Sequence, residues 1–323
     1  MSAVTDTVTP DHPTTTRGPS VRLQRILAFI LLLAQGGITV TGSIVRVTGS
    51  GLGCDTWPNC HEGSLVPVQG AAPAIHQAIE FGNRLLTFAL AAIAIAVFIA
   101  VLRASRRREI ITYSVISGLG IVVQAVLGGI SVHLDLKWWA VAIHFLPSMF
   151  LVWIAALLYM RLAEPDDLPP VRMFAPIIRT LTIVAAVCLS AVLVTGTMVT
   201  GAGVHSGDDG VGMDGRLDVD IELMALIHAG TMYVYLAATL LVVWLLYRGM
   251  ASKDAKNTAW VLVLMIAVQW TIGVIQFNLG VPRWTIPAHV AMSSVVVAFS
   301  AFLYAHGRRR ITRAEKNATV TAE

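Results

Sequence analysis

Eight long apolar segments constrain the fold of this chain more than any other feature. Each is long enough, in windows of about 19 residues, to cross a bilayer core of roughly 30 Å. Lipid offers backbone amides no hydrogen-bond partner, so the segments must be helical. The sequence, 56% hydrophobic and 13% charged over 323 residues, therefore predicts an all-α integral membrane protein. The predicted helices span residues 25–45, 78–102, 111–132, 139–160, 176–199, 222–247, 258–279 and 285–305.

The basic residues predict how the helices are oriented in the membrane. Most of the 23 Lys and Arg residues fall in the tails and in alternate loops, which the positive-inside rule assigns to the cytoplasm. Both termini are then cytoplasmic, in a bacterial plasma membrane. The net charge of +4 reflects this topology and gives no reason to expect a nucleic-acid partner. Four basic residues fall on the predicted outer side, namely Arg46, Lys137, Arg216 and Arg283.

An internal repeat divides the chain into two halves. Residues 124–144 align without a gap on residues 269–289, and "VTGSIVRVTGSG" after the first helix resembles "VTGTMVTGAGVHSG" after the fifth. Each half has an even number of crossings, so the halves are parallel and related by a pseudo-two-fold axis along the membrane normal. The predicted parts are a disordered tail (1–22), a first four-helix half (23–165), a linker (166–175), a second four-helix half (176–306) and a basic tail (307–323).

Three of the nine histidines lie at membrane depth and at related positions of the repeat. His144, His228 and His289 each lie five to eight residues inside the outer end of a helix, roughly 10 Å below the surface. A histidine at this depth can be a hydrogen-bonded packing residue, but imidazoles from two helices also suit the axial positions of a heme iron. No Cys-x-x-Cys-His motif occurs, so such a heme would be bound non-covalently. The second half has the pair His228 and His289, whereas the first half has Asn83 opposite His144.

The second predicted helix carries charges that its repeat partner lacks. The stretch "HQAIEFGNRLL" places His76, Glu80, Asn83 and Arg84 on one helix face, and the matching "LMALIHAGTMY" has alanines in place of Glu80 and Arg84. One interpretation is an ion pair that neutralises itself inside the membrane. A purely architectural pair would be expected in both halves, so Glu80 is the leading candidate for a reacting or charge-stabilising carboxylate.

Two of the three cysteines bracket a short loop after the first helix, "TGSGLGCDTWPNC". The predicted topology places Cys54 and Cys60 on the outer, oxidising side, where a disulfide can persist. The alternative is a pair of free structural thiols. Cys188, inside the fifth predicted helix, is expected to be a small core residue.

Taken together, these features resemble the heme A synthase family along nearly the whole chain. The resemblance rests on eight helices in two halves, "VTGSGLGCDTWPNC", "IEFGNRLL", "VTGAGVHSGD" and histidines on the fourth, sixth and eighth helices. It implies an oxidoreductase that converts the C8 methyl of heme O to the formyl of heme A by successive hydroxylations, for terminal oxidases. Expected partners are lipid, heme O, an unidentified electron acceptor, heme O synthase and oxidase assembly factors, with self-association left open.

The resemblance also assigns the two halves different roles. It implies heme b in the second half, on His228 and His289, and heme O in the first half, near His144 and Arg84. Many family members have His where this chain has Asn83. Either His144 alone ligates heme O with Asn83 as a hydrogen-bond partner, which we favour, or His76 substitutes from about 10 Å further out.

Two other functional classes fit part of the sequence. A diheme b-type electron carrier would explain the histidine pair but leaves Glu80 and Arg84 without a role. A transporter would explain the repeat and a site within the membrane.

Overall fold

The structure is a computed structural model that describes residues 18–203, 205 and 215–311. Within these ranges the fold is all-helical, apart from two strands of two residues each. All eight helices of the described chain are long and apolar enough to span a membrane. They are α1 (Val21–Val47), α2 (Ala74–Arg103), α3 (Arg108–His133), α4 (Trp138–Arg161), α5 (Pro176–Ala202), α6 (Ile221–Arg248), α7 (Lys253–Asn278) and α8 (Thr285–His306).

Most helices extend a few residues beyond the apolar windows that predicted them. Polar side chains cap three of the starts: Ser20 accepts the N–H of Leu23 at 3.2 Å, Asp220 accepts the N–H of Leu223 at 2.9 Å, and Ser252 caps α7. Such caps satisfy the unpaired amides of a first turn, so a helix can begin in polar sequence outside the apolar core.

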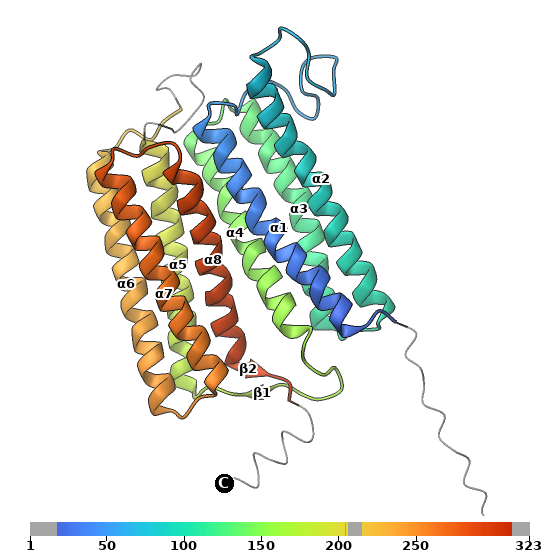
Figure 1. Cartoon of the computed structure of the whole chain (residues 1–323), viewed down its shortest axis with the longest axis vertical. Helices are drawn as coiled ribbons and strands as arrows, with labels where there is room; N and C mark the ends of the chain where they lie inside the picture. The colour runs from blue at the N-terminus through green and yellow to red at the C-terminus, as the bar shows by residue number, and fades with distance from the viewer. Residues whose placement is uncertain (1–17, 204, 206–214, 312–323) are drawn as a thin grey trace, which may run out of the picture.

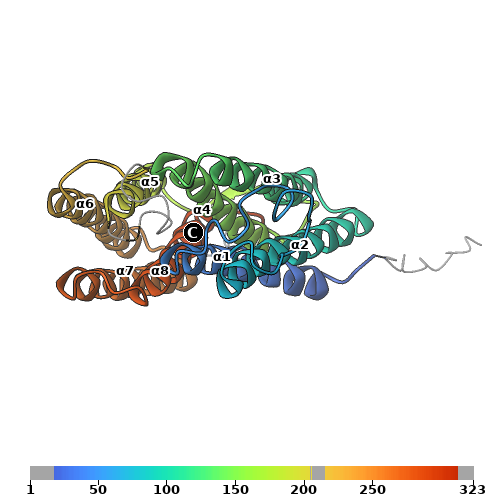
Figure 2. The ribbon, with the colours of Figure 1, turned by 90° about the horizontal axis from the view of Figure 1, so that it is seen from above.

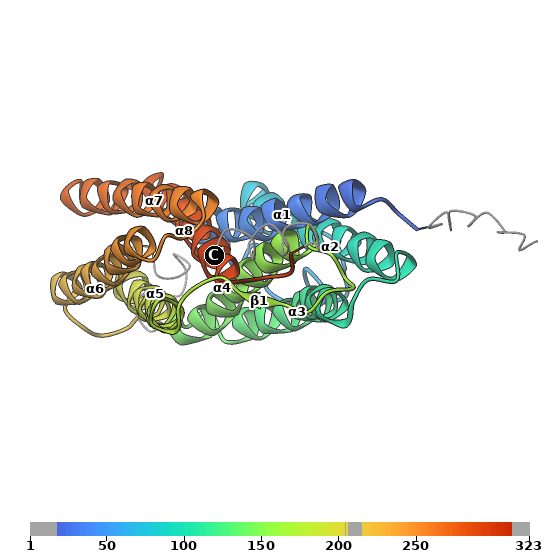
Figure 3. The same cartoon turned by 90° about the horizontal axis from the view of Figure 1, so that it is seen from below.

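The helices form two rings of four that lie side by side (Figures 1, 2 and 3). In the first ring, α1 and α3 each pack against both α2 and α4; in the second, α5 and α7 each pack against both α6 and α8. Consequently α2 faces α4 across the first ring, and α6 faces α8 across the second. The loop between α1 and α2 lies at the end of the bundle opposite the strands (Figure 1).

The two rings meet where α4 packs against α8, with further contacts between α1 and α8 and between α4 and α5. Over their most apolar windows, 56% of α4 and 44% of α8 are buried inside the protein, against 17% of α7, which is largely exposed on the outside of the bundle. Both helices carry buried alanines, and small side chains favour close packing of helices in lipid. These buried small residues are Ala155 and Ala156 on α4 and Ala298, Ala301 and Ala305 on α8.

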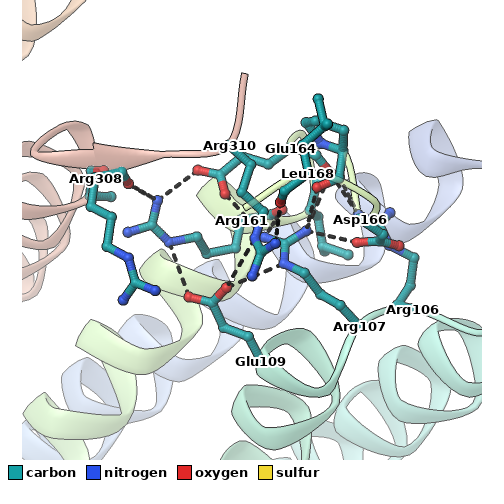
Figure 4. A network of polar contacts seen from close by, with 12 residues as sticks. Arg106, Arg107, Glu109, Arg161, Glu164, Asp166, Leu168, Arg308 and Arg310 are labelled. Atoms are coloured by element: carbon teal, nitrogen blue, oxygen red, sulfur yellow. Dashed lines mark hydrogen bonds and ion pairs between the residues drawn. The ribbon is translucent and has the colours of Figure 1, made fainter. Parts of the chain in front are cut away.

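The linker and the segment after α8 are held together at the end of the bundle that carries the strands. Strand β1 (Val171–Arg172) pairs antiparallel with β2 (Arg308–Arg309). Beside them, Arg161 is 5% exposed and donates to Glu164 at 2.6 Å and to the carbonyl of Arg308 at 2.5 Å. Arg107 binds Glu164 at 3.1 Å and Asp166 at 2.8 Å, within the network of Figure 4.

Parts of both predicted tails belong to ordered elements of the structure. The basic tail predicted for 307–323 begins with an ordered strand, because backbone pairing with β1 and Arg161 hold Arg308 and Arg309 in place. The disordered tail predicted for 1–22 ends too late, since Val21 and Arg22 belong to α1. The remainder of both predicted tails, residues 1–17 and 312–323, lies outside the described residues.

Candidate functional site

Two histidines face each other across the second ring. His228 lies in the third turn of α6 and His289 in the second turn of α8, and their ring centroids are 6.4 Å apart with a tilt of 55° between the planes. A metal–imidazole nitrogen bond is about 2 Å, and the ring centroid lies roughly 1 Å behind that nitrogen, so two axial imidazoles on one iron have centroids about 6 Å apart. The observed spacing therefore fits a pair of axial ligands.

Neighbouring helices hold both imidazoles of this pair. A Cβ added to Gly196 on α5 would lie 3.1 Å from Cε1 of His228, and one added to Gly273 on α7 would lie 3.2 Å from Cε1 of His289. Each imidazole thus packs against a helix backbone where a larger residue would crowd it. The Thr195 hydroxyl lies 3.1 Å from Nδ1 of His228, which leaves the Nε2 nitrogen for a metal.

The first ring of helices has the same arrangement of residues around its histidine, except that Asn83 stands where the second ring has His228. On α4, His144 packs against Gly128, where an added Cβ would lie 3.3 Å from Cε1. On α2, Asn83 accepts a hydrogen bond from the Thr41 hydroxyl at 2.7 Å, just as Thr195 contacts His228. An added Cβ on Gly42, which follows Thr41, would meet nothing within 4 Å among the described residues. The amide of Asn83 leaves more room than an imidazole would.

Glu80 is buried, 5% exposed, and both of its carboxylate oxygens are engaged. Oε1 accepts from Arg84 at 2.6 Å, and Oε2 accepts from the backbone N–H of Cys54 at 2.6 Å. Arg84 also donates to the carbonyls of Asn59 at 3.0 Å and Cys54 at 3.1 Å. The predicted ion pair is present, and it also fastens the cysteine loop to α2.

The cysteine loop is a compact cap over α2 and α3. Cys54 and Cys60 form the predicted disulfide and are fully buried. Next to it, the His61 ring lies 2.9 Å from Asp55 and 3.0 Å from Gln77 of α2. These contacts hold the loop at a second place on α2, one turn before Glu80.

On its other side, the loop packs against α3. The Trp57 ring lies directly on Gly129, where any side chain would overlap it. The carbonyl of Trp57 is 3.2 Å from Nε2 of His133. Glu80 is therefore enclosed by the loop on one side and by its own helix on the other.

A model of the COX15-CtaA family, described as cytochrome oxidase assembly proteins, matches residues 25–301. The chain belongs to this family. It is 34% identical over 104 residues to a heme A synthase of Geobacillus thermodenitrificans, covering 31% of this chain and 30% of that relative. It is 30% identical over 116 residues to a heme A synthase of Geobacillus kaustophilus (strain HTA426), covering 35% of each. The matched stretches span about a third of the length of these relatives.

For this member of the COX15-CtaA family, the structure brings some predicted residues together and leaves others separate. His228 meets His289, and Glu80 meets Arg84 and the cysteine loop. His76, the alternative ligand, lies in the first turn of α2, where Gly53 packs against its backbone.

Several residues that hold the histidines in this COX15-CtaA protein were not predicted from the sequence. Thr41 and Thr195 contact Asn83 and His228, and the glycines at 128, 196 and 273 pack against imidazoles. A signal for them existed, because the repeated "VTG" and the Gln-x-x-x-Gly spacing recur in both halves. Their partners could not be assigned, since these lie on other helices.

Proposed function

We propose that this protein is a heme A synthase, an oxidoreductase that converts the C8 methyl group of heme O to the formyl group of heme A by successive hydroxylations, for terminal oxidases. The observation that carries the proposal is the facing pair His228 and His289, with ring centroids 6.4 Å apart. Membership of a family of cytochrome oxidase assembly proteins and relatives named heme A synthase support the same function.

In this proposal the second ring holds a resident heme b. His228 and His289 would hold its iron, since the spacing of their imidazoles fits two ligands of one metal. A heme b held by these two histidines would supply one-electron transfer. The protein would fix the imidazoles of His228 and His289 in place through Gly196, Gly273 and the Thr195 hydroxyl.

The first ring would receive heme O. His144 is its proposed ligand, with Asn83 as a hydrogen-bonding neighbour and Arg84 close by on the same helix. A site with one imidazole binds less permanently than a site with two, which suits a substrate that must arrive and leave. Glu80 would accept a proton or stabilise positive charge at the methyl carbon as it is oxidised.

The proposed membrane topology places both termini in the cytoplasm and the cysteine loop on the outer face. The distribution of Lys and Arg supports this orientation. The two rings have the same order of helix contacts, which supports a pseudo-two-fold axis along the membrane normal. The loop would then cap the substrate ring from the oxidising side.

The proposal is tested by chromatography of hemes from bacteria that make heme O, with and without this protein. Heme A should appear only when the protein is present, and the purified protein should show a six-coordinate b-type spectrum. A b-type spectrum without heme A would favour a diheme electron carrier, and a protein without any heme would favour a transporter. Either result would overturn the proposal.

A further inference from the structure

Two glutamines occupy matching places in the rings, and the proposed function gives neither of them a role. Gln124 lies on α3 and Gln269 on α7, each on the helix before the one that carries a histidine. Nε2 of Gln124 donates to the His144 carbonyl at 2.8 Å and to the Ser148 hydroxyl. Nε2 of Gln269 donates to the Ser293 hydroxyl at 2.8 Å.

Each serine connects its glutamine to a histidine. Ser148 lies one turn after His144 and donates to its carbonyl at 3.2 Å, and Ser293 lies one turn after His289 and donates to its carbonyl at 2.9 Å. The same three-residue unit is therefore built in both rings. A single packing contact would have no reason to recur with this chemistry.

Each unit contains two buried polar atoms that have no hydrogen-bond partner among the described residues. They are Oε1 of the glutamine and Nδ1 of the histidine, in Gln124 with His144 and in Gln269 with His289. One atom is an acceptor, and the other is a donor in one tautomer, so they are complementary. Nδ1 of His228, in contrast, lies 3.1 Å from Thr195.

The backbone places Nδ1 near the helix that carries the glutamine. Gly128 and Gly273 lie one turn after Gln124 and Gln269, on the same helix faces. A Cβ on Gly273 would lie 3.2 Å from Cε1 and 3.7 Å from Nδ1 of His289, and a Cβ on Gly128 would lie 3.3 Å from Cε1, 3.6 Å from Nε2 and 3.8 Å from Nδ1 of His144. The His289 ring therefore presents its Cε1–Nδ1 edge toward α7, and the His144 ring presents Cε1 toward α3 with Nδ1 within 4 Å of the Gly128 Cβ position.

We propose that Gln124 and Gln269 are positioning residues that accept the Nδ1–H hydrogen bonds of His144 and His289 when their Nε2 atoms bind heme iron. The inference rests on the proposed function. Histidines that bind metals usually donate their other N–H to an outer acceptor, which fixes the tautomer and raises the basicity of the ligand. An amide oxygen is a neutral acceptor, so each glutamine sets the heme potential between the values for no acceptor and for a carboxylate.

The test measures the midpoint potential of the resident heme in purified holoprotein. Gln269→Leu should raise the potential and weaken heme retention by about 10- to 100-fold, because the outer hydrogen bond is lost. Gln269→Glu should lower the potential, since a carboxylate is the stronger acceptor. Asn278→Leu is the matched control: it removes an exposed amide on the face of α7 opposite Gln269, and it should leave the potential unchanged.

The inference fails if Gln269→Leu retains the wild-type potential, or if Gln269→Leu and Gln269→Glu shift it in the same direction. It also fails if Asn278→Leu shifts it as much as Gln269→Leu, because the effect would not depend on His289. All of these outcomes still show a bound heme. Failure of the proposed function is different, since wild-type protein would then contain no six-coordinate heme or make no heme A.

Discussion

Replacing Glu80 with Gln should weaken the contact between the cysteine loop and α2. Glu80 accepts the Cys54 N–H with one oxygen and Arg84 with the other, both at 2.6 Å. A glutamine can still accept from Cys54, but its NH₂ group then faces the Arg84 guanidinium. The variant loses one charge-assisted hydrogen bond and the charge on the remaining acceptor.

The cost can be estimated from the contacts that remain. A hydrogen bond to a charged group contributes about 1.5–3 kcal/mol. The bond between Glu80 and Arg84 lies within α2, and Arg84 keeps the carbonyls of Asn59 and Cys54. The tether is therefore weakened only at the Cys54 N–H, whose acceptor changes from charged to neutral. A hydrogen bond to a neutral acceptor contributes about 1 kcal/mol less, so we expect loop opening to become easier by about 1 kcal/mol, which at 1.4 kcal/mol per tenfold is about 5-fold in the opening equilibrium.

The assay is the rate at which a water-soluble thiol reduces the Cys54–Cys60 disulfide in the purified protein. Both cysteines are fully buried, so reduction requires the loop to open, and Glu80→Gln should accelerate it about 5-fold. Glu62→Gln is the matched control, because Glu62 lies in the same loop and is exposed. Equal reduction rates for Glu80→Gln and wild type would refute the tether.

The same variant also distinguishes a structural role of Glu80, as a tether of the loop, from its proposed catalytic role. If Glu80 takes part in the reaction, cells with Glu80→Gln should keep normal heme b in the protein, accumulate heme O or its hydroxylated intermediate, and lack heme A. If the carboxylate serves only as a tether, heme A should still form while the disulfide stays oxidised. Normal heme A production by the variant would therefore contradict a catalytic role.

Three further results are expected. Replacing His228 or His289 with Ala should abolish the six-coordinate heme spectrum, and its retention in both variants would exclude this pair as the ligands. Alkylation without reductant should label neither Cys54 nor Cys60, as mass measurement would show, and full labelling would contradict the disulfide. Asn83→His should add a second six-coordinate signal when heme is supplied, because the amide leaves room for an imidazole; an unchanged spectrum would show that this position does not face the iron.

Much of the architecture could be predicted because lipid imposes it residue by residue. A segment that crosses a bilayer must be apolar and helical, so the eight helices followed from hydropathy alone. The depths of His228 and His289 followed in turn, since a helix rises by a constant amount per residue. The repeat marked Gln124 and Gln269 as equivalent positions, and the two cysteines indicated the disulfide.

The contacts of these residues were decided only by the tertiary structure. The sequence paired Glu80 with Arg84 on one helix, but the N–H of Cys54 reaches that carboxylate from a loop 26 residues earlier. Thr195 on α5 contacts His228 on α6, and β1 pairs with β2 although the four helices of the second ring lie between them in the sequence. Hydropathy and helical periodicity describe one segment at a time, whereas these contacts depend on how helices distant in sequence pack together, which no single segment encodes.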